Sequence, residues 1–478
     1  MALPVFKLKI NANVILHTMR GGIGASWHAM SKDIPLENET YDYPVRYQNP
    51  RGSAYGGNPP ISETDAWEQI CGHASWLGLN FIRVELSQRM YEPQRGVFDW
   101  NNEETLALYR ILDWCESHGA DVFLQQMWGH VEWNAFPGVH PLLSAPRSLD
   151  DFASGVRELL SNLLRTKNYT CIKYFSITNE PPGGTWGYWW SYGQGSGTIT
   201  PALSRVREYL DAAGIALPLS APDWTSLPPL DPKQIDFDQF IGAYDIHSYN
   251  GIDSQKEGII REWAEWAHAR QKPFFLSEFG NMHMGWGGDH GGPKSFEAAL
   301  SNASDILCCL NLGADGMNRW SFVNRGDLDG QWQLIQTWDR EKKIYLKKIL
   351  PENPAYFGFG IMSRYIGKYA SVVQSERLAL SPQIKTAALI SRTGEMTAFF
   401  LNSGETPERV SVEIIGETAK SKFYLYQVSQ ELVSKEGFCL APTETEQEPS
   451  GERFLTLPEK SISVLTNYYL KPDDPGII

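Results

Sequence analysis

The chain has 478 residues, a length that suits one large domain and one smaller domain. Hydrophobic residues make up 42% of it and charged residues 21%, which are ordinary globular values and argue against global disorder. Acidic residues outnumber Lys and Arg by 56 to 42, and no basic stripe compensates locally for the net charge of −14. Such a protein repels phosphate groups, so we expect neither nucleic acid nor an anionic membrane as a partner.

The N-terminus begins no signal peptide, because the basic and long apolar regions that define one are both missing. No apolar run reaches the roughly 18 residues of a membrane-spanning helix. We therefore expect a cytoplasmic protein from the sequence as written, or a secreted or periplasmic one if the sequence is that of a trimmed mature chain. The six cysteines match the spacing of neither a zinc site nor a disulfide framework, so they are expected to be free thiols.

Short apolar strands alternate with amphipathic helices through most of the chain. Residues 3–18 alternate like a strand, and the polar stretch 31–62 is typical of a long loop. The strands expected next are residues 23–27, 81–85, 121–126, 172–177, 217–220, 243–247, 273–277 and 316–320. The helices expected between them are residues 65–76, 103–118, 149–165, 201–213, 256–270 and 295–312. This α/β order implies a parallel sheet, and about eight strands at this length predict a closed (β/α)8 TIM barrel over residues 20–364.

The pattern changes after about residue 365, where turns rather than helices separate the strands. The strands expected here are residues 385–390, 397–401, 410–414, 423–426 and 461–465. They predict an appended C-terminal β-sandwich domain over residues 365–478, and the strands of residues 1–19 are expected to join it. The acidic tract 443–453 is expected to be a solvated loop.

Two glutamates end very apolar strands, at the end of the barrel where such folds carry their chemistry. Glu180 follows the fourth expected strand and Glu278 follows the seventh. Glycosidic cleavage needs two carboxyl groups flanking one bond, about 5–5.5 Å apart on the retaining route. Strands four and seven face each other across an eight-stranded barrel, so two inward side chains can reach that separation. For one such Glu alone, an ordinary ion pair with an arginine would be the better interpretation.

Three segments resemble clan A glycoside hydrolases. Residues 177–181 (ITNEP) resemble the acid/base motif, residues 275–280 (FLSEFG) the nucleophile strand, and residues 91–100 (YEPQRGVFDW) the segment after the second strand. The likeness spans roughly residues 20–345. The barrel is similar to the cellulase/mannanase-type family 5, whereas the appended sandwich is similar to families 30 and 39.

The resemblance implies roles for the matched positions. Glu180 would be the general acid/base and Glu278 the nucleophile. Asn179 would hydrogen-bond the sugar 2-hydroxyl, and Tyr249 would donate to Glu278. His247 would sit beside the acid/base, although a satisfied core histidine is the alternative.

Arg83 would position Glu278 from below, although a simple ion pair within the barrel is the alternative. Trp320 would form the floor of the −1 subsite. Other aromatic side chains that follow strands are expected to contact sugar rings: Trp27, Trp128, His130 and Trp286. No metal and no cofactor is expected, because the retaining route needs neither.

We therefore predict a retaining glycoside hydrolase that cleaves a β-linked glycoside by double displacement. Long loops after strands one, four and seven favour a pocket, and hence exo action on oligosaccharides. The alternatives are an endo-acting β-glycanase of the cellulase, mannanase or xylanase type, and a non-catalytic glycan-binding protein on the same scaffold. A sugar-phosphate isomerase or aldolase is disfavoured, because a basic phosphate loop and a strand-end lysine are both missing. The oligomeric state is not readable from the sequence.

Overall fold

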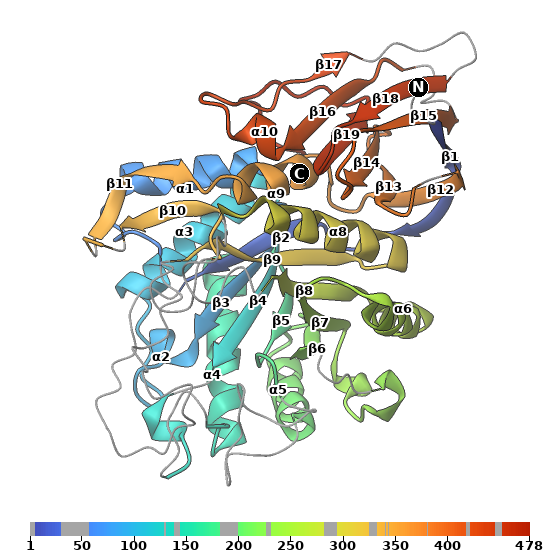
Figure 1. Ribbon diagram of the computed structural model, residues 1–478. Helices are drawn as coiled ribbons and strands as arrows, with labels where there is room; N and C mark the ends of the chain where they lie inside the picture. The colour runs from blue at the N-terminus through green and yellow to red at the C-terminus, as the bar shows by residue number, and fades with distance from the viewer. Residues whose placement is uncertain are drawn as a thin grey trace.

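The structure is a computed structural model that describes residues 5–29, 57–128, 131–137, 144–181, 199–225, 231–281, 294–324, 332–339, 341–342, 344–379, 381–416, 421–444 and 452–478. These residues form a closed parallel barrel and a second, curled sheet (Figure 1). Among the described helices, none combines the length and the apolar character that crossing a membrane requires.

Eight parallel strands close the barrel, because the last strand, β9, pairs with both β8 and β2. The strands are β2 (Ile23–His28), β3 (Phe81–Ser87), β4 (Asp121–Trp128), β5 (Ile172–Ser176), β6 (Leu219–Thr225), β7 (Ala243–Tyr249), β8 (Phe274–Gly280) and β9 (Gly316–Val323). The predicted (β/α)8 barrel is confirmed. Two further strands, β10 (Ile335–Asp339) and β11 (Ile344–Pro351), extend this sheet beyond β9 as an antiparallel pair.

Helices cover the outer face of the barrel (Figure 1). They are α1 (Thr64–Trp76), α2 (Gln88–Tyr91), α3 (Glu103–His118), α4 (Leu149–Ser161), α5 (Thr200–Ala212), α6 (Ser254–Ala269) and α8 (Phe296–Leu312). Shorter turns are η2 (Glu132–Asn134), η4 (Asn162–Thr166), η7 (Pro232–Gln234) and η8 (Asp238–Phe240). Helix α3 shows why the sequence predicts these elements well. Asn102 accepts hydrogen bonds from the first-turn N–H groups of Glu104 and Thr105, and Gly119 ends the helix at a left-handed φ of 72°.

Alternate residues of each barrel strand serve two different cores. Outward side chains pack against the helices in the main hydrophobic cluster. Inward side chains at the N-terminal end of the strands form a small aromatic plug of Phe81, Phe123 and Phe275. Gly24 of β2 lets the backbone approach β3 here, because a Cβ at this position would lie 1.9 Å from the carbonyl oxygen of Phe81. The plug seals one end of the barrel, so polar inward side chains gather at the other end.

The second sheet has nine strands in the order β17-β16-β19-β14-β13-β12-β1-β15-β18. They are β1 (Val5–Thr18), β12 (Ser371–Ala379), β13 (Ile384–Ile390), β14 (Met396–Asn402), β15 (Glu408–Ile415), β16 (Tyr424–Ser429), β17 (Thr443–Glu444), β18 (Glu452–Leu457) and β19 (Ser461–Thr466). It curls around its own apolar cluster as a sandwich-like domain (Figure 1). The N-terminal strand β1 pairs with β12 and β15. The expected domain limits after residues 19 and 364 stay predictions.

Two segments differ from the expected elements. The tract 443–453 is not wholly a loop, because β17 begins it and β18 starts at Glu452. Helix α9 (Ala355–Ser363) was not expected, and lies with α8 between the barrel and the curled sheet (Figure 1). The two helices pack closely, since a Cβ on Gly358 of α9 would lie 2.6 Å from the Cβ of Ala299 of α8. The barrel also contacts the curled sheet, because Asn311 Nδ2 of α8 donates to the carbonyl oxygen of Thr386 of β13 at 2.9 Å.

Candidate active site

A one-residue register shift turns Glu278 into the barrel mouth. Ile246 of β7 pairs with Leu276 of β8, but the next residue of β7, His247, pairs with Glu278. Ser277 is therefore an extra residue, and it faces inward to hydrogen-bond a β7 side chain. Strict alternation would then turn Glu278 to the outer face, whereas the shift keeps it inside.

A similar shift in β6 brings Asp223 and Glu180 together. The register changes between Pro222 and Trp224, which leaves Asp223 as the extra residue with a left-handed φ of 56°. Glu180 lies in the segment that follows β5, after residues 177–179, and also has a positive φ, 44°. Its N–H donates to the carbonyl oxygen of Asp223 at 2.8 Å. Both carboxyl groups thus reach the mouth from backbone conformations that are unusual for residues other than glycine.

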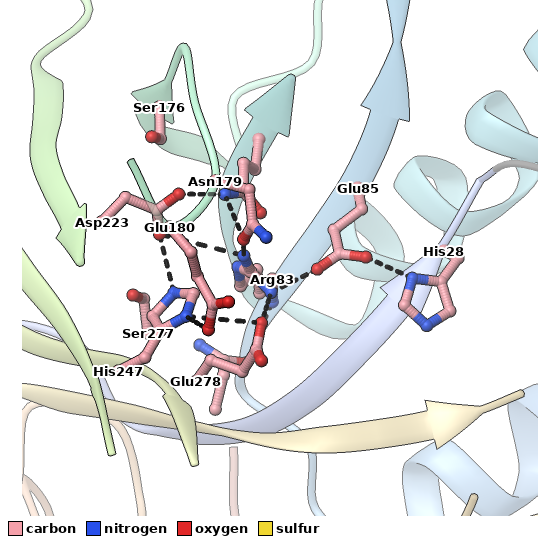
Figure 2. Close-up of polar contacts among 12 residues, drawn as sticks. His28, Arg83, Glu85, Ser176, Asn179, Glu180, Asp223, His247, Ser277 and Glu278 are labelled. Atoms are coloured by element: carbon pink, nitrogen blue, oxygen red, sulfur yellow. Dashed lines mark hydrogen bonds and ion pairs between the residues drawn. The ribbon is translucent and has the colours of Figure 1, made fainter. Parts of the chain in front are cut away.

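Glu278 is enclosed by hydrogen-bond donors and is 4% exposed (Figure 2). Arg83 Nη1 lies 2.5 Å from Glu278 Oε2, and the Tyr249 hydroxyl donates to Oε1. Burial raises the pKa of Glu278 to about 8, while the positive charges of His247 and Arg83 pull in the opposite direction. The group that we expect to attack is therefore desolvated, and depends on its neighbours for its charged form.

Glu180 faces His247 rather than Arg83. Its Oε1 lies 2.9 Å from His247 Nδ1, and its side chain is 6% exposed. Asn179, the preceding residue, accepts a hydrogen bond from Arg83 Nη2 at 2.7 Å through Oδ1. The amide nitrogen of Asn179 is therefore the donor left for a sugar hydroxyl, because the guanidinium bond fixes which end of the amide is oxygen.

The two candidate catalytic carboxyls lie close together. Glu180, His247 and Glu278 each contribute one atom to a group in which all the atoms lie within 4.8 Å of one another. The same spacing would suit a metal ion, but Arg83 already places a cation on Glu278 Oε2 at 2.5 Å. We therefore interpret the group as two carboxyls bridged by an imidazole.

His247 is fully buried and connects the two carboxyls to a deeper one. Its Nε2 lies 2.8 Å from Asp223 Oδ1, and its Nδ1 lies 3.7 Å from Glu278 Oε2 (Figure 2). Burial alone would lower the pKa of His247, but the carboxylates of Glu278 and Asp223 outweigh it and raise the pKa well above its usual value. The two ring nitrogens of His247 therefore connect the carboxyls of Glu180 and Asp223.

A second pair of residues supports Arg83 from the other side. Arg83 Nη1 donates to Glu85, and the other oxygen of Glu85 contacts His28 Nδ1 (Figure 2). The His28 ring meets the ring of Trp320 edge-on, with centroids 4.8 Å apart. Glu85 and His28 were not among the predicted site residues. Glu85 could have been found from its spacing, since it lies two residues after Arg83 on the same face of β3.

The structure corrects one predicted sugar contact. Trp27 is fully buried on the outer face of β2, where its ring stacks on Trp67 of α1 at 6.4 Å and donates to Asn58. The prediction that Trp27 contacts substrate is wrong, because the next residue, His28, is the one that faces the mouth.

The remaining predicted aromatics are placed only in part. Trp320 is 4% exposed and lies beside Arg83, whose guanidinium carbon is 5.8 Å from the ring centroid. Trp128 ends β4, but its side chain, like His130 and Trp286, lies outside the described residues. A further aromatic, Trp332, meets the ring of Tyr249 edge-on at 5.9 Å.

This arrangement defines a class of protein. A (β/α)8 barrel with two buried carboxyls facing each other at the C-terminal end of its strands, beside an arginine, an imidazole and aromatic rings, has the site of a glycoside hydrolase.

Comparison with known families agrees with this class. The family description "Cellulase (glycosyl hydrolase family 5)" matches residues 48–309, more than half of the chain. The chain therefore belongs to glycosyl hydrolase family 5. No curated protein sequence matches it significantly.

Several solved structures share the fold across both parts of the chain. A glycoside hydrolase family 30 subfamily 8 xylanase from Clostridium acetobutylicum has a TM-score of 0.63 and 16% identity, over 96% of this chain and 99% of that one. A family 30 endoxylanase from Clostridium papyrosolvens C71 has a TM-score of 0.61 and 12% identity, over 96% and 99%. An endo-β-1,6-glucanase has a TM-score of 0.62 and 14% identity, over 98% and 96%. At these identities the likeness shows the fold alone.

Proposed function

We propose that the protein hydrolyses a β-linked glycoside with retention of anomeric configuration, through a covalent glycosyl-enzyme on Glu278. The observation that carries the proposal is the spacing of the carboxyls, whose nearest oxygens lie within 4.8 Å. Retaining enzymes hold the two groups about 5–5.5 Å apart, whereas inverting enzymes need about 6.5–9.5 Å to admit a water between them.

In the first step, Glu278 attacks the anomeric carbon while Glu180 gives its proton to the departing glycosidic oxygen. The C–O bond to the leaving group breaks as the bond to Glu278 forms. Arg83 and Tyr249 hold the attacking carboxylate in place, since both donate to its oxygens. Asn179 presents its amide nitrogen to the 2-hydroxyl, a contact that strengthens as positive charge develops on the sugar ring.

In the second step, water attacks the same carbon and Glu180 takes the proton from that water. The bond to Glu278 breaks, and the sugar leaves with its original configuration. The imidazole of His247, 2.9 Å from Glu180, donates to the carboxylate that the first step creates. One carboxyl thus acts first as acid and then as base, while the other stays a nucleophile and leaving group.

For the substrate we propose exo action on oligosaccharides. The support is the length of three connections, from β2 to α1, from β5 to α5 and from β8 to α8, which all leave the C-terminal end of the barrel. Long connections at this end favour a pocket, and a pocket favours exo action. An endo-acting β-glycanase is the second candidate, since the solved structures with the same fold include a xylanase, an endoxylanase and an endo-β-1,6-glucanase.

The test is a panel of nitrophenyl α- and β-glycosides with wild type beside Glu278→Gln. Release from one β-glycoside, abolished in the variant, would support the proposal and identify the sugar. Proton NMR of the first-formed product should show the β anomer, whereas an α anomer would overturn retention. Glu180→Ala should keep activity only on substrates with good leaving groups, which need no proton.

The same panel separates the candidates. No hydrolysis of any nitrophenyl glycoside, together with cleavage of a β-glucan, mannan or xylan, would support the endo enzyme. Binding of glycans without turnover of either kind would favour a glycan-binding protein instead, and full activity in both Glu variants would end the proposal.

A further inference from the structure

Two buried aspartates lie next to His247, and one of them, Asp223, contacts the ring nitrogen that faces away from Glu278. Asp223 of β6 and Asp245 of β7 are both fully buried, and one oxygen of each lies within 4.8 Å of the other and of a His247 ring nitrogen. We call them the inner carboxyl pair. Asp223 contacts Nε2 of His247 while Glu180 and Glu278 face Nδ1, so the imidazole separates Asp223 from a sugar held between those two carboxyls (Figure 2).

The members of the inner carboxyl pair have different surroundings. Asp223 faces cations and an amide, since His247 Nε2 lies 2.8 Å away, Arg83 Nη2 lies 3.8 Å away and Gln125 Nε2 donates to it. In the described part of the chain, the hydroxyls of Ser220 at 2.6 Å and Ser277 at 2.9 Å donate to Asp245, and its carboxyl also contacts that of Asp223.

The negative charge of the pair therefore belongs on Asp223 and the proton on Asp245. Burial raises the pKa of Asp245 to about 8, and the charge of Asp223 adds to the effect. Two carboxylates this close in a dry interior cannot both ionise cheaply, so one keeps its proton at neutral pH.

A charged Asp223 determines the state of His247. It accepts the Nε2 proton, which leaves Nδ1 directed at Glu180 at 2.9 Å and at Glu278 at 3.7 Å. The titratable and charged groups around the imidazole are Glu180 after β5, the inner carboxyl pair on β6 and β7, Glu278 on β8 and Arg83 on β3. Among them Asp223 is the carboxyl that hydrogen-bonds the ring and takes no part in the reaction.

We propose that Asp223 is a positioning residue that acts through His247: it holds the ring as an imidazolium, and the charge of the ring keeps Glu278 ionised for attack. The inference rests on the proposed roles of Glu180 and Glu278. Without the charge of Asp223, His247 loses a counter-ion and becomes neutral at a lower pH. Glu278, which also faces Arg83, Tyr249, Glu180 and Glu85, then loses one of its two cations and ionises only at a higher pH.

The inner carboxyl pair offers a matched control. Asp223→Asn removes the charge, whereas Asp245→Asn replaces a protonated carboxyl by a neutral amide of the same shape. The His247 ring signal among the 10 histidines is assigned by its loss in His247→Gln, and is then titrated by NMR in wild type and both variants. We expect the titration midpoint of His247 to fall by about 1–3 pH units in Asp223→Asn, which is the usual effect of removing an opposite charge in direct contact. The midpoint should stay unchanged in Asp245→Asn.

The kinetic readout uses the dinitrophenyl β-glycoside that wild type cleaves fastest, because this leaving group needs no acid. The acidic limb of kcat/KM should move to higher pH in Asp223→Asn and stay in place in Asp245→Asn. An unchanged His247 midpoint in Asp223→Asn, equal shifts in both variants, or a wild-type His247 that is neutral at pH 7 would overturn the inference. The last result needs neither aspartate variant to fold. Inactivity on every glycoside would end the proposed hydrolysis, while the imidazole titration would still decide the role of Asp223.

Discussion

The Tyr249 hydroxyl is the contact of the nucleophile that can be removed with the least disturbance. Tyr249→Phe deletes the donor to Glu278 Oε1 and keeps the ring, which packs edge-on against Trp332 at 5.9 Å. A hydrogen bond to a charged group is worth about 1.5–3 kcal/mol. Because about 1.36 kcal/mol corresponds to one pH unit, its loss should raise the pKa of Glu278 by about 1–2 above a value that burial already places at about 8.

The assay is the pH dependence of kcat/KM on a dinitrophenyl β-glycoside, for wild type and Tyr249→Phe. The nucleophile works as a carboxylate, so activity rises with pH through the pKa of Glu278. Well below that pKa the variant should be slower by about 10–100-fold, and the two enzymes should converge in alkaline solution. If the acidic limb of the wild-type profile gave a pKa near 4.5, the ordinary value for Glu, the reasoning would be refuted. A loss of kcat/KM in Tyr249→Phe that is equally large at every pH would also refute it.

Three further predictions concern the scaffold around the site. Arg83→Met leaves Glu85 and Glu278 buried without their shared cation, and should lower the free energy of unfolding by about 3–5 kcal/mol in urea titrations; a loss below 1 kcal/mol would contradict a structural role for the ion pairs. Trp27→Ala should cost about 3–5 kcal/mol by the same measurement while KM stays unchanged, since the ring packs in the core; a raised KM would restore it to the subsite. Burial raises the pKa of Asp305 to about 7, so the folded state holds this proton more tightly than the unfolded chain and wild-type stability falls as pH rises from about 4 to 7. Asp305→Asn should therefore be more stable than wild type at pH 8, by up to roughly 4 kcal/mol, and not at pH 4; an equal difference at both would contradict the assignment.

The barrel elements could be predicted because each carries its own boundary signals. Helix α8, for example, begins after Ser295, whose hydroxyl accepts from the N–H of Ala298, and ends at Gly313 with a φ of 96°. Helix α9 was missed because it is apolar nearly all round, being buried between the barrel and the curled sheet. A helix without a polar face has no 3.6-residue period to detect.

The candidate catalytic pair could be predicted because Glu180 and Glu278 are charges at the ends of apolar strands. Trp27, by contrast, was misplaced. All six residues of β2 are buried, but Ile23, Ala25 and Trp27 alternate with Gly24, Ser26 and His28, so the period of two already turns Trp27 toward the helices. The inward side chain, His28, was missed because the expected strand ended at Trp27, one residue too early.

The two-residue alternation of side chains along a strand explains which residues around His247 could have been predicted from the sequence. Asp245, His247 and Tyr249 lie two residues apart on β7, whereas Tyr244, the residue before them, packs outward on Trp263 of α6 at 5.9 Å. Three titratable groups on one face of a strand that is otherwise apolar form a pattern that alternation alone predicts to be inward. The partner groups break that rule, because Asp223 and Glu278 reach the mouth through register shifts that strand periodicity does not encode. The site therefore combines one strand that follows the period with two that depart from it, and inserting a single residue within β7 would turn the imidazole away from both catalytic carboxyls at once.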